Sequence, residues 1–189
     1  MMALILASGS PRRAEILQNA GFDFHIRPAD VDETLPAGTA PADAAYELAL
    51  RKARAAAELY PEDVILASDT LVAPGNTILG KPRGAADAAR MLRLLSGRTH
   101  TVYTGVCVCA AGRERCEVVP TQVEFIRLTD DQIARYIATG EPMDKAGAYG
   151  IQGRGCLFIR RIDGDYYSVM GLPICRTAQI LEEFSIFPR

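Results

Sequence analysis

The feature that most constrains the fold is the uninterrupted apolar run Val64-Ile65-Leu66-Ala67, which polar residues bound on both sides. A short apolar run without alternation is typical of a central strand that is buried on both faces. Such a strand needs covering elements on each side, and it delivers Ser68-Asp69-Thr70 at its carboxyl end. The run therefore predicts an α/β protein with polar side chains at one end of a central strand.

The residues before this run alternate between strand and helix patterns. Residues 3–7 form a short apolar strand, which leads through Ser8-Gly9-Ser10-Pro11 into a helix. This helix should end near Gly21. Residues 22–27 then alternate as a strand. Over residues 41–59, apolar side chains recur three and four apart in a segment rich in good helix formers, which predicts a long amphipathic helix.

The residues after the run continue the mixture. In order, they predict a hairpin over 71–79, a helix over 85–95, strands over 100–109 and 115–127, a helix that opens with a capping box at Thr129, a hairpin at Asp163-Gly164, and a final helix from Leu172-Pro173. Strands joined partly by hairpins and partly by crossovers imply a mixed central sheet flanked by helices. Neither a repeat nor a linker interrupts the pattern, so residues 1–189 are expected to form one domain.

Charge and composition exclude several classes of protein. A net charge of −2 and a pI near 5.7 leave no broad basic surface, so binding to nucleic acid or to an anionic membrane is not expected. The apolar N-terminal run is too short for a signal peptide and no segment is long enough to span a membrane, which favours a cytoplasmic location. The five cysteines lack C-x-x-C spacing, so we expect reduced thiols.

The loop Ser8-Gly9-Ser10 is a candidate phosphate site. A strand that leads through such a loop into a helix can offer backbone N–H groups to an anion, and Arg12 and Arg13 add two guanidinium groups. The loop carries no Walker A signature, and a capped helix with two surface arginines would give the same local pattern.

Two acidic residues are candidates for metal or water chemistry. Asp69 is expected where the central strand surfaces, which is the usual position of ligands in open α/β sheets. Glu33 lies in the acidic stretch 30–34, and Mg²⁺ needs only one or two carboxylates besides substrate phosphates. A turn stabilised by Asp69 and a solvated acidic loop are the alternative interpretations.

Two lysines complete the set of candidate residues. Lys52 interrupts the apolar face of the predicted 41–59 helix, so its ammonium either extends to the surface or reaches an internal phosphate. Lys81, between Gly80 and Pro82, is either a turn residue or another phosphate donor. Phosphate donors combined with two acids, without a Ser/His/Asp triad or a Cys/His pair, favour metal-assisted attack of water on a phosphoanhydride.

Five sequence blocks, in order along nearly the whole chain, resemble the Maf family of nucleotide pyrophosphatases. They are residues 6–13 (LASGSPRR), 32–33 (DE), 68–70 (SDT), 80–82 (GKP) and 145–153 (KAGAYGIQG), and the segment 167–173 (YSVMGLP) agrees as well. The resemblance implies a mixed-sheet α/β fold similar to that of inosine triphosphate pyrophosphatases. It also implies a cleft that binds a nucleoside triphosphate with Mg²⁺ or Mn²⁺.

The resemblance assigns a role to each matching residue. Asp69, the proton acceptor, and Lys81 are the implied catalytic residues, Ser8, Arg13 and Lys52 bind substrate, Arg12, Thr70 and Gln152 set specificity, and Glu33 with Asp69 lies near the metal. Residues 11–13 and 149–153 resemble the subgroup acting on dTTP and UTP rather than the 7-methyl-GTP subgroup. A Gln152 amide can match the O4 and N3–H of uracil or thymine, but it can flip to suit cytosine. Its orientation must therefore be fixed by neighbouring residues.

Two other functions share parts of this pattern. A nucleotidyltransferase can combine a strand, a Gly/Ser/Arg loop and a later Lys-Pro pair. A regulator that binds nucleotide or a cell-division partner without turnover is the second alternative, because the family has been linked to septum formation. The family often forms dimers, which makes a homodimer the candidate assembly.

Overall fold

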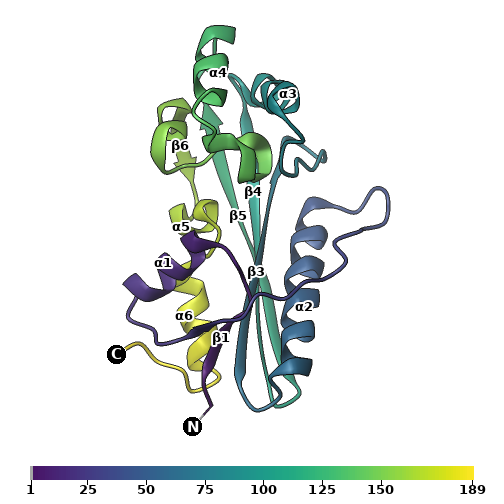
Figure 1. The fold of residues 1–189 in the computed structure, drawn as a ribbon, viewed down its shortest axis with the longest axis vertical. Coiled ribbons are helices and arrows are strands. Elements are labelled where there is room, and N and C mark those ends of the chain that lie inside the picture. Colours follow the sequence, from purple (N-terminus) through teal and green to yellow (C-terminus); the bar gives the residue numbers. More distant parts are fainter. Residues whose placement is uncertain (1) are drawn as a thin grey trace.

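The computed structural model describes residues 2–189 and contains a six-stranded sheet in the order β2-β1-β3-β4-β5-β6 (Figure 1). The strands are β1 (Leu4–Leu6), β2 (His25–Ile26), β3 (Val64–Ala73), β4 (Thr99–Ala110), β5 (Arg113–Phe125) and β6 (Ile159–Asp163). Strand β1 pairs in parallel with β2 and β3, whereas β3, β4, β5 and β6 pair antiparallel in succession. The predicted mixed sheet is therefore confirmed.

Helices cover both faces of this sheet. They are α1 (Pro11–Asn19), α2 (Pro41–Leu59), α3 (Ala85–Leu95), α4 (Asp130–Ile137), α5 (Tyr166–Met170) and α6 (Ile174–Glu182), with 3-10 turns η1 (Glu141–Asp144), η2 (Ala146–Ala148) and η3 (Gly153–Phe158). Figure 1 shows α2 on one side of the sheet and α1 and α6 on the other, with α3 and α4 at one end of the molecule. Within residues 2–189, no helix is both long and apolar enough to cross a membrane.

Strand β3 extends further than its apolar run. Ser68, Asp69 and Thr70 lie inside the strand and not at its carboxyl end, because the antiparallel pairing with β4 continues to Ala73 opposite Thr101. Alternation along the strand places Asp69 on the same face as Ile65 and Ala67, which pack against α2. Ser68 and Thr70 point to the opposite face.

Three other local predictions were wrong. The strand predicted over 22–27 is limited to β2, because β1 has only three residues and its pairing with β2 involves two of them. The hairpin predicted over 71–79 reduces to one isolated bridge between Val72 and Leu79. No hairpin forms at Asp163-Gly164, because the Asp165 carboxylate accepts hydrogen bonds from two backbone N–H groups at the start of α5.

Helix α2 approaches the sheet closely opposite Asp69. Gly105 on β4 pairs with Asp69, and a Cβ at this position would lie 2.1 Å from the Ala45 carbonyl oxygen of α2. Only a residue without a side chain fits this contact. The close approach brings the middle of α2, including Lys52, over the centre of β3.

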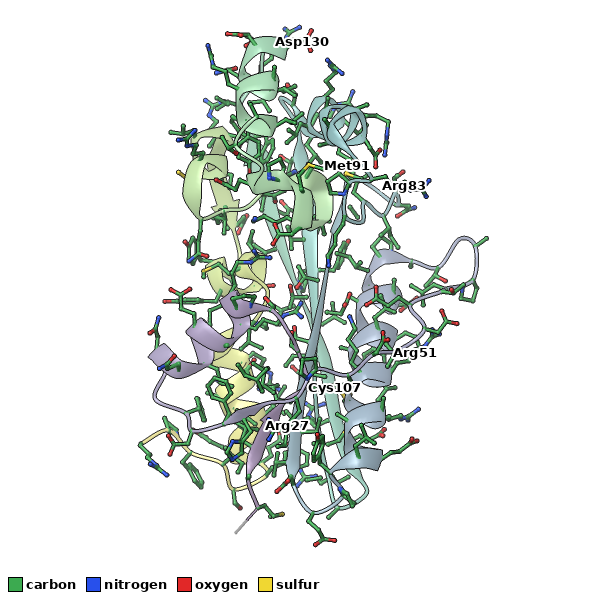
Figure 2. All side chains as sticks on the ribbon, viewed as in Figure 1. Arg27, Arg51, Arg83, Met91, Cys107 and Asp130 are labelled. Atoms are coloured by element: carbon green, nitrogen blue, oxygen red, sulfur yellow. A yellow bond between two sulfur atoms is a disulfide. The ribbon has the colours of Figure 1, made fainter. Side chains whose placement is uncertain are left out.

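The cysteines differ from the expectation of reduced thiols. Cys107 on β4 and Cys116 on β5 are opposite each other, with Cα atoms 4.1 Å apart, and their sulfur atoms form a disulfide. Figure 2 labels Cys107 in the central part of the sheet. Sequence spacing does not reveal this pair, because it depends on the register between two long strands. Cys109 is a buried free thiol.

Candidate active site

A cleft of about 950 Å³ lies along a free edge of β3. Strand β1 pairs only with residues 64–66 of β3, so this edge stays open until Val72 bridges to Leu79. The volume is in the range of small-molecule sites. The residues that line the cleft include every predicted site residue: Ser8, Arg12, Arg13, Glu33, Lys52, Asp69, Thr70, Lys81 and Gln152.

Lys52 connects the two predicted acidic residues. Its Nζ lies 2.5 Å from Asp69 Oδ1 and 2.7 Å from Glu33 Oε1. Burial lowers the pKa of Lys52, but the charge of Asp69 and the hydrogen bonds to both carboxylates outweigh burial and raise it above its ordinary value. The ammonium is therefore charged and directed into the cleft, and the alternative of an ammonium that extends to the surface is wrong.

Asp69 retains one oxygen for chemistry. Its side chain is 11% exposed, and Oδ1 is bound to Lys52. Among the hydrogen bonds within residues 2–189, none uses Oδ2 of Asp69. A carboxylate held by one oxygen and open at the other can accept a proton from a water molecule in the cleft.

The segment that carries Glu33 is held in place by Arg51, a residue that the sequence did not single out. Arg51 Nη1 donates to the carbonyl oxygens of Asp32 and Thr34, at 3.0 and 2.9 Å. The Asp32 carboxylate also accepts the Thr34 N–H at 2.8 Å, which closes a tight turn. Figure 2 labels Arg51 on α2. No sequence signal distinguished Arg51 from the other charged residues of α2.

Arg13 organises the opposite wall of the cleft. Its guanidinium donates to the Gly171 carbonyl oxygen at 2.8 Å, to Ser8 Oγ at 3.0 Å and to Thr70 Oγ1 at 3.2 Å. Burial lowers its pKa, yet an arginine remains charged at neutral pH. A partly buried cation beside two hydroxyl groups is a suitable partner for a phosphate oxygen.

The far end of the cleft carries Arg12, Lys81 and Gln152. Arg12 Nη1 lies 3.6 Å from an oxygen of Asp144, which also accepts a 2.7 Å hydrogen bond from Lys145. In the described part of the chain, no hydrogen bond involves the side chains of Lys81 or Gln152, so both are available to a ligand. The sequence did not single out Asp144, which lies directly before the 145–153 block.

The acidic residues fit a divalent cation that shares its coordination with substrate. Residues 2–189 contain no group of three or more His, Cys, Asp or Glu side chains that could form a metal site without other ligands. Oxygens of Glu33 and Asp69 nevertheless converge on one cationic group, the Lys52 ammonium. Two convergent carboxylates are sufficient for Mg²⁺ when phosphates and waters supply the remaining ligands.

Known proteins resemble this chain over nearly its full length. The sequence profile of the family described as Maf-like protein matches residues 3–184. The dTTP/UTP pyrophosphatase of Bacillus cytotoxicus is 50% identical over 184 residues, which are 97% of this chain and 96% of the relative. That of Bacillus cereus is 50% identical over 186 residues, or 98% and 97% of the two chains.

A solved structure shows the same kind of fold. The structure of a HAM1 protein from Coxiella burnetii superimposes with a TM-score of 0.50 at 21% identity, covering 68% of this chain and 75% of that one. The family profile and the two relatives cover nearly the whole chain, and the cleft gathers residues from the family's motifs. The chain belongs to the Maf-like protein family.

Proposed function

We propose that the protein hydrolyses dTTP and UTP to the nucleoside monophosphate and pyrophosphate. The observation that carries the proposal is the position of Asp69, whose carboxylate lies in a cleft with Lys52, Arg13 and Lys81 around it. Concentrated positive charge suits a triphosphate, and the single free carboxylate oxygen suits a water molecule. The names of the two relatives, each about half identical in sequence, support the same substrates.

The proposed reaction is attack of water on the α-phosphorus. Asp69 Oδ2 accepts a proton from the water while the water oxygen forms a bond to the α-phosphorus. The bond from this phosphorus to the oxygen that bridges to the β-phosphorus breaks. Pyrophosphate leaves with the electron pair of the broken bond. Lys52 holds Asp69 in place through Oδ1, so the proton acceptor does not need to reorient during the reaction.

The other predicted residues have roles in binding. Ser8, Arg13 and Lys52 would contact the phosphates, and Lys81 would neutralise the charge that develops on them. Glu33 and Asp69 would hold Mg²⁺ or Mn²⁺, which supplies Lewis-acid stabilisation of phosphoryl oxygens when bound. Arg12, Thr70 and Gln152 are proposed to set base and sugar specificity.

Product analysis tests the proposal directly. Purified protein would be incubated with Mg²⁺ or Mn²⁺ and, separately, with dTTP, UTP, CTP, GTP and 7-methyl-GTP, and nucleotides, pyrophosphate and phosphate would be quantified. We expect monophosphate and pyrophosphate in equal amounts from dTTP and UTP. An Asp69→Asn preparation made in parallel controls for contaminating hydrolases.

Other outcomes would separate the alternatives. Release of diphosphate and phosphate would contradict attack at the α-phosphorus. Binding of nucleotide without turnover would favour the regulatory function, and turnover only with an added sugar phosphate would favour a nucleotidyltransferase. A cytoplasmic location, assembly into a homodimer and the treatment of residues 1–189 as one domain stay predictions.

A further inference from the structure

The segment that carries Gln152 is fixed through the carboxylate of Glu141. Glu141 Oε2 accepts the Arg154 N–H at 2.9 Å, and Oε1 accepts the Gly155 N–H at 3.1 Å. These two amides follow Gln152 at the start of η3. Both oxygens of Glu141 are thus used by protein groups, which ties the segment to Glu141.

Tyr136, on α4, secures the other side of the same segment. Its hydroxyl donates to Glu141 Oε1 at 2.9 Å and accepts the Gly150 N–H at 3.2 Å. Gly150 precedes Gln152 by two residues. The Glu141–Tyr136 pair therefore holds the backbone on both sides of Gln152, while the Gln152 amide has no hydrogen bond within residues 2–189.

The segment is also closely packed, which limits its freedom to move. A Cβ at Gly155 would lie 2.1 Å from the Gly150 carbonyl oxygen and 2.8 Å from the Tyr136 hydroxyl. Lys145 Nζ donates to the Glu141 carbonyl oxygen at 2.6 Å and so ties the backbone at Glu141 to the same loop. Displacement of Glu141 would therefore shift residues 150–155 together.

We propose that Glu141 and Tyr136 are positioning residues for base selection, which hold the backbone around Gln152 so that its free amide presents one face to uracil or thymine. The inference rests on the proposed function. It supplies neighbouring residues that the sequence could not identify. A fixed backbone limits the rotamers that bring the Gln152 amide to the base, whereas a loosened segment also admits the flipped amide, which suits cytosine. In the orientation that suits uracil or thymine, the Gln152 NH₂ group donates to O4 and its oxygen accepts N3–H. With cytosine, the same orientation would place the Gln152 NH₂ group opposite the amino group of the base, which is also a donor.

The backbone hydrogen bonds also keep Glu141 ionised. Burial raises the pKa of Glu141, but the hydrogen bonds from the N–H groups of Arg154 and Gly155 and from the Tyr136 hydroxyl lower it by more. The pKa of Glu141 therefore lies below the ordinary value for glutamate. An ionised carboxylate is a stronger acceptor than a neutral amide. The substitution Glu141→Gln retains the volume of the side chain but replaces one acceptor oxygen with a donor that faces an N–H or O–H group.

The test compares Glu141→Gln and Tyr136→Phe with the unaltered protein. For each, dissociation constants of non-hydrolysable UTP and CTP analogues would be measured with Mg²⁺, together with kcat and KM for UTP and CTP. We expect the preference for uracil over cytosine to fall about tenfold in both variants, as for loss of a charge-assisted hydrogen bond. The effect should appear mainly in KM, because the phosphate-binding wall is unchanged.

The control is Glu58→Gln, which makes the same chemical change at an exposed position of α2. Hydrogen exchange at the backbone amides of Gly150, Arg154 and Gly155 gives a measurement that does not depend on activity. Exchange should be faster in Glu141→Gln than in the unaltered protein, and unchanged in Glu58→Gln. An unchanged base preference in a folded Glu141→Gln protein would overturn the inference, even if exchange were faster. Tight, uracil-selective binding without hydrolysis would overturn the proposed function and leave the positioning role supported by the binding ratios.

Discussion

At the scale of single residues, Asp69 combines two demands on one carboxylate. One oxygen is bound to Lys52 at 2.5 Å, and the other has no protein partner within the described residues. The same side chain is therefore both anchored and reactive. Its position inside β3 results from strand alternation, which directs it to α2.

Replacing Asp69 with Asn should lower kcat about a hundredfold or more, because an amide cannot accept the proton of the attacking water. The size of the side chain is retained, so the protein should still fold and bind nucleotide. Steady-state kinetics with UTP and a circular dichroism spectrum would check both statements. Asp43→Asn, at an exposed position of α2, should keep its activity. Turnover within a factor of about two of the unaltered rate would remove Asp69 from proton transfer.

The buried side chain of His100 should make the stability of the folded protein depend on pH. It is 2% exposed, it forms a 2.7 Å hydrogen bond between Nε2 and the Tyr149 hydroxyl, and burial lowers its pKa to about 4. The unfolded chain therefore binds the proton first, and stability falls as pH drops from 6.5 towards 4. His100 should account for about 2 kcal/mol of the loss between pH 7 and pH 5.

Urea denaturation at several pH values would measure this contribution. The slope of unfolding free energy against pH should be smaller for His100→Gln than for the unaltered protein. His25→Gln, in the exposed strand β2, should leave the slope unchanged. Identical slopes for all three proteins would show that His100 does not titrate differently in the folded state.

At the scale of elements, the contact between α2 and β4 determines whether Lys52 reaches Asp69. Gly105→Ala would place a methyl group 2.1 Å from the Ala45 carbonyl oxygen, so α2 must move away from the sheet. We expect a loss of about 2 kcal/mol in stability and at least tenfold in kcat/KM. Denaturant titration and kinetics with UTP would measure both. Gly84→Ala, where nothing lies within 4 Å of the added Cβ, should leave kcat/KM unchanged and cost less stability than Gly105→Ala, the remaining cost being that of alanine at the N-cap of α3.

Elements with strong local signals were predictable from the sequence. The alanine-rich pattern of 41–59 and the capping box at Thr129 both correspond to helices with the expected start. The final helix predicted from Leu172-Pro173 also forms, whereas the length of β3 and the turn after Asp163 were not predictable. The first depends on pairing with β4, and the second on an Asp165 side chain that caps α5 instead of forming a turn. Non-local pairing and capping compete with turn patterns.

The site shows the same division. The candidate site residues that the sequence indicated all line the cleft. Arg51 and Glu141 were not identified from the sequence. Each of them binds backbone groups of another segment of the chain, and neither belongs to a motif. Contacts with main-chain atoms leave little trace in the side chains of the partner segment, so a single sequence does not reveal them.

At the scale of the whole molecule, the cleft joins segments from both ends of the chain, from Ser8 to Gly171. A ligand that contacts all of them should stabilise the folded state. At a hundred times its dissociation constant, a non-hydrolysable UTP analogue with Mg²⁺ should add about 2.7 kcal/mol, which raises Tm by roughly 5–10 °C. Thermal denaturation monitored with and without the analogue would measure the shift. An unchanged Tm under conditions where calorimetry shows saturation would contradict this arrangement.

The course of β3 has a further consequence for how such a protein can diversify. Because Asp69 lies within a strand paired to β4, its carboxylate is carried by the backbone of the sheet, whereas Gln152 lies in a segment outside the sheet, between η2 and η3. Changes around Gln152 can therefore accumulate without altering the strand that carries Asp69. The part of base selection that Gln152 carries can evolve while the reaction is kept, whereas the part that Thr70 carries stays tied to β3.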